Sequence, residues 1–171
     1  MGRLILAVDP GMTGAWALLS ATGEVLHVDD LPIIADQGTK WVDAEVLSSA
    51  LFSQIAGRDT TAVVERVHAM PKNGCIAAFS QGSTLCSLLA TLQMVRLRIE
   101  LVASQTWKTQ LGLRAPKGTT DDARKELSRQ RARLLFPAAA DRLERKKDHN
   151  RAEAILLAHW YISKASQRAA A

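Results

Sequence analysis

Four carboxylates stand out because they interrupt otherwise apolar segments that lie far apart in the chain. Asp9 and Glu65 each end a short apolar run, and a charged residue in that position is seldom buried without a partner. Asp148 and Glu153 open the last predicted helix. Carboxylate oxygens are the ligands that Mg²⁺ prefers, and two such ions about 3.5–4 Å apart can drive phosphodiester hydrolysis. The four acids therefore predict a two-ion site.

Each acid also has an ordinary structural interpretation. Asp9 could simply start the turn Asp9–Gly14, and Glu65 could pair with a neighbouring arginine, Arg58 or Arg66. Asp148 and Glu153 are separated by about 140° around a regular helix. They can share one ion only if Asp148 lies at or before the cap, outside the regular helix, and Asp148 or Asn150 could equally be a plain helix cap.

The elements that must position these acids follow from hydrophobic periodicity. Short apolar or β-branched runs predict strands at 3–9, 15–19, 24–28, 60–65 and 97–102. Helical spacing predicts helices at 43–56, 76–94, 104–111 and 148–164, and a basic helix that follows residues 119–122 and runs to Phe136. Three strands in succession, followed by strands alternating with helices, indicate one mixed sheet covered by helices, in a single domain over 1–171. Asp9 and Glu65 converge if the first and fourth strands are neighbours.

Charge is divided unevenly along the chain. Residues 1–102 carry 7 Lys and Arg against 10 Asp and Glu, whereas residues 103–171 carry 15 against 7. A basic second half is typical of a protein that binds a polyanion, although a solvated helix face gives the same pattern. The candidate phosphate contacts are Lys108, Lys117, Arg124, Lys125, Arg129 and Arg131.

The two cysteines argue for a reducing compartment. Cys75 and Cys86 lie within one predicted helix and form no CxxC motif, so we expect reduced thiols in the core and a cytoplasmic protein. The apolar run after Met1 suits a first strand better than a secretion signal, and no membrane span is expected.

An ordered series of motifs resembles the RuvC-type crossover junction endonucleases, and among them the phage and chloroplast branch more than bacterial RuvC. The series spans nearly the whole chain and consists of Asp9-Pro10-Gly11 with Thr13-Gly14, Val63-Val64-Glu65-Arg66, Lys125-Glu126-Leu127-Ser128-Arg129, Phe136-Pro137, and Asp148-His149-Asn150-Arg151-Ala152-Glu153-Ala154. The resemblance implies a ribonuclease H-like α/β fold, a mixed five-stranded sheet flanked by helices. It also implies a homodimer that uses Mg²⁺ or Mn²⁺ to make paired symmetric nicks in four-way DNA, in the cytoplasm of a bacterial or phage-infected bacterial cell.

The resemblance assigns roles to individual residues. Asp9, Glu65, Asp148 and Glu153 match the acidic positions, although Glu153 replaces the usual Asp of RuvC, and Asn150 replaces another acid. Lys125 matches a basic residue near the scissile phosphate. The family's aromatic wedge at the junction centre has no counterpart here, and His68 or Met70 could take its place. His149 could approach the metal or lie in solvent.

Three other functions remain open at this point. A ribonuclease H-like nuclease for RNA or RNA–DNA hybrid would need the same acids. A non-catalytic junction-binding protein would not need all four. An actin-like ATPase uses similar acidic glycine turns, but this chain is short for that fold and has no Walker-type Gly-Lys-Ser/Thr loop.

Overall fold

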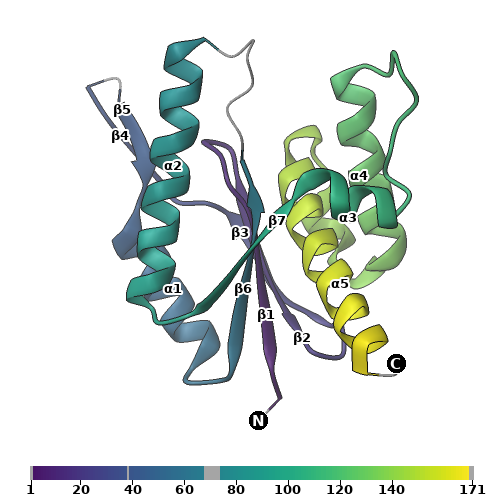
Figure 1. Cartoon of the computed structure of the whole chain (residues 1–171), viewed down its shortest axis with the longest axis horizontal. Helices are drawn as coiled ribbons and strands as arrows, with labels where there is room; N and C mark the ends of the chain where they lie inside the picture. Colours follow the sequence, from purple (N-terminus) through teal and green to yellow (C-terminus); the bar gives the residue numbers. More distant parts are fainter. Residues whose placement is uncertain (1, 38, 68–73, 170–171) are drawn as a thin grey trace.

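A mixed five-stranded sheet forms the centre of the computed structural model, which describes residues 2–37, 39–67 and 74–169. The strand order is β3-β2-β1-β6-β7 (Figure 1). The first three strands, β1 (Leu4–Asp9), β2 (Ala15–Ser20) and β3 (Val25–Asp30), form an antiparallel meander. Parallel to β1 run β6 (Thr60–Arg66) and then β7 (Arg98–Ala103). The five predicted strands and their mixed pairing are confirmed.

A small hairpin that the sequence analysis missed lies outside this sheet. Its strands β4 (Ile33–Asp36) and β5 (Thr39–Val42) pair antiparallel and lie against helix α2 (Cys75–Met94). Each strand has only four residues, and Asp36, Thr39 and Lys40 dilute its apolar pattern. Tertiary packing on α2, rather than local alternation, therefore specifies these strands.

Helices cover both faces of the sheet, and β1 shows how the alternation of a strand supplies two cores. Leu4, Leu6 and Val8 pack with α1 (Ala44–Ile55) and α2. Ile5 and Ala7 point to the opposite face, which holds α3 (Ser104–Gln110), α4 (Asp121–Leu135) and α5 (His149–Ala169). A single domain over 1–171 stays a prediction.

The helix boundaries follow local signals. Asp43 caps α1 by accepting a hydrogen bond from the backbone N–H of Val46, and Thr120 caps α4 through Ala123. Pro137 follows the end of α4 and starts the 3₁₀ helix η1 (Pro137–Leu143), because proline cannot donate to a continuing helix. A second 3₁₀ turn, η2 (Lys146–Asp148), leads directly into α5.

One expectation about α2 is wrong. Cys75 and Cys86 are free but exposed rather than buried, because the buried side of α2 is formed by Thr84, Leu88, Thr91 and Leu92. The helix also has the length and apolar composition of a membrane span, since its 20 residues include no charge. One such helix is weak evidence for a membrane, and this one packs on α1 and on the sheet through its buried side.

Candidate metal centre and its surroundings

Three of the four predicted acids meet at one end of the sheet. Asp9, Glu65 and Glu153 each offer a carboxylate oxygen, and these oxygens lie within 4.8 Å of one another. The register pairs Ala7 with Val63 on the neighbouring parallel strands, so Asp9 and Glu65 follow two residues later on the same face. That face is the one covered by α5, which contributes Glu153.

The turn after Asp9 holds the first carboxylate tightly. A Cβ at Gly14 would lie 2.8 Å from the backbone nitrogen of Gly11, and closer still to the carbonyl oxygen of Asp9. Only glycine fits that close approach. Asn150 donates from Nδ2 to the Thr13 carbonyl and to Thr13 Oγ1, the latter at 3.1 Å, which ties the first turn of α5 to the same loop.

Two buried donors orient the carboxylates, and neither was predicted. Trp107 Nε1 on α3 donates to Glu65 Oε2 at 2.9 Å, and Ser128 Oγ on α4 donates to Glu153 Oε1 at 3.0 Å. Trp107 is fully buried and Ser128 is 3% exposed. The available signal was a Trp and a Ser on the inward side of otherwise polar helices. Pattern alone could not say which acid each would meet.

Lys108 enters the same cluster rather than the open surface. Its Nζ lies 2.7 Å from Glu153 Oε2 and 5.0 Å from the centre of the Trp107 ring. Burial by itself lowers the pKa of the Lys108 ammonium, but Glu153, Glu65 and Asp9 outweigh it, so the pKa is raised. Lys108 therefore remains charged and partly offsets the three acids.

Burial, together with neighbouring like charges, raises the pKa of two of the acids. Burial is the largest cause that raises the pKa of Asp9 well above its usual value, followed by the charges of Glu153 and Glu65. Burial likewise raises the pKa of Glu65, and Lys108 only partly opposes this. Such sites favour either protons or a cation. Three oxygen donors at this separation suit a hard divalent ion such as Mg²⁺.

Asp148 lies apart from these three. Its carboxylate receives hydrogen bonds from the backbone N–H of Arg145 at 2.7 Å and from the Arg145 guanidinium, with NH2 to Oδ1 also at 2.7 Å. Burial would raise the pKa of Asp148, yet the Arg145 bonds hold it below its usual value. The structure gives Asp148 a capping contact before α5, and its role as a metal ligand stays a prediction.

The predicted phosphate contacts occupy different places. Arg129 is committed within the fold, since it binds Glu126 at 2.7 Å and the backbone carbonyls of Leu143 and Glu144. Arg124 pairs with Asp121 at the surface. Lys117, Lys125 and Arg131 are exposed as well. His68 and Met70 lie outside the described residues.

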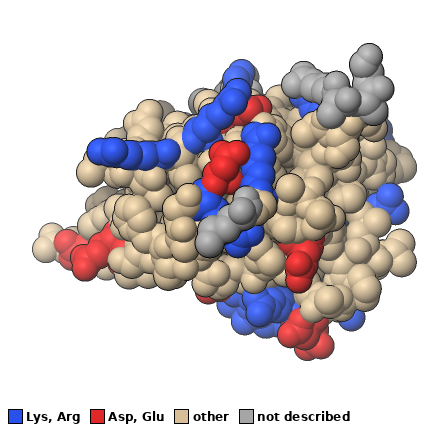
Figure 2. All heavy atoms as spheres, turned by 90° about the horizontal axis from the view of Figure 1, so that it is seen from below, with Lys and Arg blue, Asp and Glu red and all other residues tan. Residues whose placement is uncertain are grey.

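The opposite end of the molecule has no field of a single sign. Figure 2 views the structure from below, where Lys and Arg side chains are interspersed with acidic ones on a mostly uncharged surface. One ion pair outside the metal centre joins Arg3, at the start of β1, to Asp59. The carboxylate cluster lies at the other end, where the parallel strands β1 and β6 finish (Figure 1).

Comparison with known proteins supports the resemblance from sequence. No model of a known protein family matches the chain. Over 93 residues, 54% of this chain, it is 36% identical to the chloroplastic Holliday junction resolvase MOC1 of Chlamydomonas reinhardtii. The match spans 10% of the length of that relative. Since that relative is chloroplastic, a bacterial or phage-infected host is not singled out, and the cytoplasmic compartment stays a prediction.

Solved structures agree on the fold. RuvC of Thermus thermophilus in complex with a Holliday junction substrate matches with a TM-score of 0.61 and 14% identity, over 96% of each chain. A second Thermus thermophilus RuvC structure gives a TM-score of 0.58 at the same identity and coverage. The ribonuclease H-like architecture, with a mixed five-stranded sheet flanked by helices, is therefore confirmed.

Proposed function

We propose that this chain is a Holliday junction resolvase, a divalent-metal-dependent endonuclease that nicks four-way DNA. The observation that carries the proposal is the group Asp9, Glu65 and Glu153 at the end of a RuvC-like sheet. The chloroplastic resolvase relative supports the same activity for this chain. A binding protein or a structural protein does not need three carboxylates held so close together that they repel one another.

The reaction would divide between a bound cation and residues of the chain. Asp9, Glu65 and Glu153 would hold Mg²⁺ or Mn²⁺, with two ions per site as the proposed number. Such ions activate the attacking water and stabilise the leaving oxygen. The chain itself keeps the ligand oxygens in place, because Trp107 fixes Glu65 and Ser128 fixes Glu153. A hollow lined by Glu65 and Gln105 among other residues borders this site and would give a strand of DNA room beside it.

Binding would depend on phosphate charge, whereas selection would depend on shape. Contacts from Lys117, Lys125 and Arg131 neutralise phosphates without reading bases. Each neutralised phosphate contributes roughly 0.9 to the log–log salt slope on duplex DNA. Discrimination for a junction then requires two such surfaces in a fixed relation, which a branched molecule alone can contact together.

A homodimer supplies those two surfaces. One site nicks one strand, and a two-fold substrate needs two symmetric nicks. Helix α2 offers a side that, among the described residues, exposes Ile76 and Phe79, at 88% and 73%. Small residues between and beside them permit close approach of a second helix. They are Ala77, Ala78, Ser80, Gly82 and Ser83.

The decisive experiment uses a synthetic mobile four-way junction, with and without Mg²⁺, and maps the nicks on every strand. Paired nicks at symmetric positions that require the ion are the expected result. Linear duplex and RNA–DNA hybrid of the same sequence serve as controls. Faster cleavage of the hybrid than of the junction would replace the proposal with a ribonuclease activity.

A further inference from the structure

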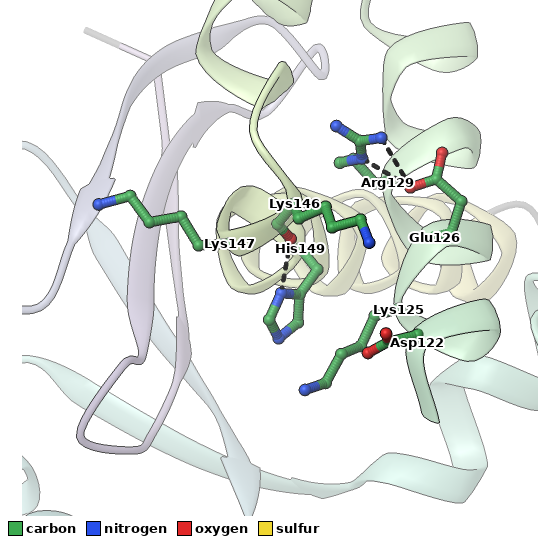
Figure 3. A pocket seen from close by; sticks show the side chains of 7 residues that line it. All are labelled: Asp122, Lys125, Glu126, Arg129, Lys146, Lys147 and His149. Carbon is green, nitrogen blue, oxygen red and sulfur yellow. Dashed lines mark hydrogen bonds and ion pairs between the residues drawn. The ribbon is translucent and has the colours of Figure 1, made fainter. Parts of the chain in front are cut away.

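A second hollow lies between α4 and η2, separate from the cluster of Asp9, Glu65 and Glu153. Figure 3 shows its lining, which consists of Asp122, Lys125, Glu126, Arg129, Lys146, Lys147 and His149. Four of these seven side chains are Lys or Arg and two are acidic. The hollow is therefore a basic surface, in contrast to the acidic group formed around Glu153.

The positive charge that remains available comes from Lys125 and Lys146. Arg129 is already neutralised by Glu126 at 2.7 Å. Within the described ranges, Lys125 and Lys146 take part in no ion pair shorter than 4.0 Å. Lys146 extends toward the α4 side of the hollow, whereas Lys147, which also lines it, extends in the opposite direction (Figure 3).

His149 lines the hollow beside Lys125 and Lys146. Its Nδ1 lies 3.0 Å from the carbonyl oxygen of Lys146, and because a carbonyl can only accept, Nδ1 carries the hydrogen. In the neutral imidazole Nε2 is then an acceptor, so the donors for an anion in the hollow are the lysines, toward one of which, Lys125, the ring extends (Figure 3). His149 therefore lines the basic hollow and does not belong to the cluster of Asp9, Glu65 and Glu153.

The hollow lies one helical turn from the metal centre along two helices at once. Lys125 precedes Ser128 by three residues on α4, and His149 precedes Glu153 by four on α5, while Ser128 binds Glu153. One turn of helix advances about 5.4 Å. Successive phosphates of a DNA strand advance about 3.4 Å along the duplex axis. The separation thus corresponds to one or two nucleotides.

We infer that the basic hollow binds a backbone phosphate of the cleaved DNA strand, one or two nucleotides from the bond that is cut, through Lys125 and Lys146. This rests on the proposed nuclease function and gives the enzyme a second point of attachment to the strand. Two fixed phosphates define the direction of the strand across the carboxylates, which a single contact cannot do.

The test replaces one phosphate at a time with a neutral methylphosphonate on each side of the mapped nick. The native sequence should lose about tenfold in single-turnover kcat/KM at one position, one or two nucleotides from the cut, because hydrogen bonds to charged groups are among the stronger ones. The Lys125→Ala/Lys146→Ala double variant should show the same loss with normal DNA and no further loss with the modified strand.

Lys40→Ala is the control, since it removes an exposed lysine on β5 that does not line the hollow. It should keep the sensitivity of the native chain to the methylphosphonate. Undiminished sensitivity in the double variant would overturn the inference. If the protein nicks no branched DNA, the proposed nuclease function fails. The phosphate site is then tested by the binding of four-way DNA to the Asp9→Asn protein over several salt concentrations. If adding Lys125→Ala/Lys146→Ala to that protein leaves the salt slope of binding unchanged, the phosphate site is overturned as well.

Discussion

Trp107 Nε1 donates a hydrogen bond of 2.9 Å to Glu65 Oε2, and this contact joins α3 to the end of β6 beneath the metal centre. The indole is fully buried, so the donor has no water to compete with the carboxylate. A buried partner that orients a ligand fixes the geometry on which ion affinity depends. Trp107 therefore acts on the reaction through Glu65.

Trp107→Phe should weaken ion use while leaving most of the packing. Loss of the hydrogen bond should raise the Mg²⁺ concentration for half-maximal nicking by about tenfold, the lower range for lost orienting partners. A titration of nicking rate against Mg²⁺ measures this. Trp160→Phe provides the control, because its Nε1 donates to Gln110. Equal Mg²⁺ dependence of both variants would show that only general packing is at stake.

Asp9→Asn should abolish nicking yet stabilise the protein in the absence of divalent ions. Its carboxyl has a raised pKa in the folded state, chiefly through burial and then through Glu153 and Glu65. The folded state therefore holds the proton more tightly than the unfolded state, and stability falls as pH rises from the unfolded pKa through the folded pKa. Asparagine removes that loss.

Urea unfolding in EDTA between pH 4.5 and 7.5 measures the effect. The free energy of unfolding of the native chain should fall relative to Asp9→Asn as pH rises, by about 1.4 kcal/mol for each unit of raised pKa. Saturating Mg²⁺ should reverse the order at neutral pH, because ligation needs the ionised carboxylate. Nicking by Asp9→Asn within about tenfold of the native rate would remove Asp9 from the ligand set.

The sequence predicted the sheet and two of its acids for a clear physical reason. Asp9 and Glu65 end buried strands whose alternation sets their face, so convergence needed only that β1 and β6 be neighbours. The position of Asp148 was not predictable in the same way. Whether the Asp148 carboxylate binds a basic side chain or a metal ion depends on the position of Arg145, and tertiary packing sets that position. Trp107, Ser128 and the hairpin β4–β5 likewise depend on packing across the chain.

Asp148→Asn separates a structural role from a ligand role. If the Arg145 contacts are its function, the variant should lose about 1–3 kcal/mol of stability, as expected for a disrupted hydrogen-bonded charge, and should nick normally below its melting temperature. The loss should vanish at low pH, since the lowered pKa of Asp148 contributes stability only above that folded value. Arg145→Ala should reproduce the stability loss. Abolished nicking with unchanged stability would instead establish Asp148 as a ligand.

Phe79→Asp should convert a dimer into a monomer if the exposed side of α2 is the interface. Phe79 is 73% exposed, and burial of a phenylalanine contributes about 1.5–3 kcal/mol. A two-fold interface places the substitution in both copies, so the loss doubles and a charge is added on each side. Sedimentation at micromolar concentration measures the mass. Phe52→Asp on α1, where the side chain is 59% exposed, is the matched control and should leave the dimer intact.

The monomeric variant should also nick the two strands of a junction independently, because each site then acts alone. Paired nicking by a Phe79→Asp protein that sediments as a dimer would place the interface on another surface.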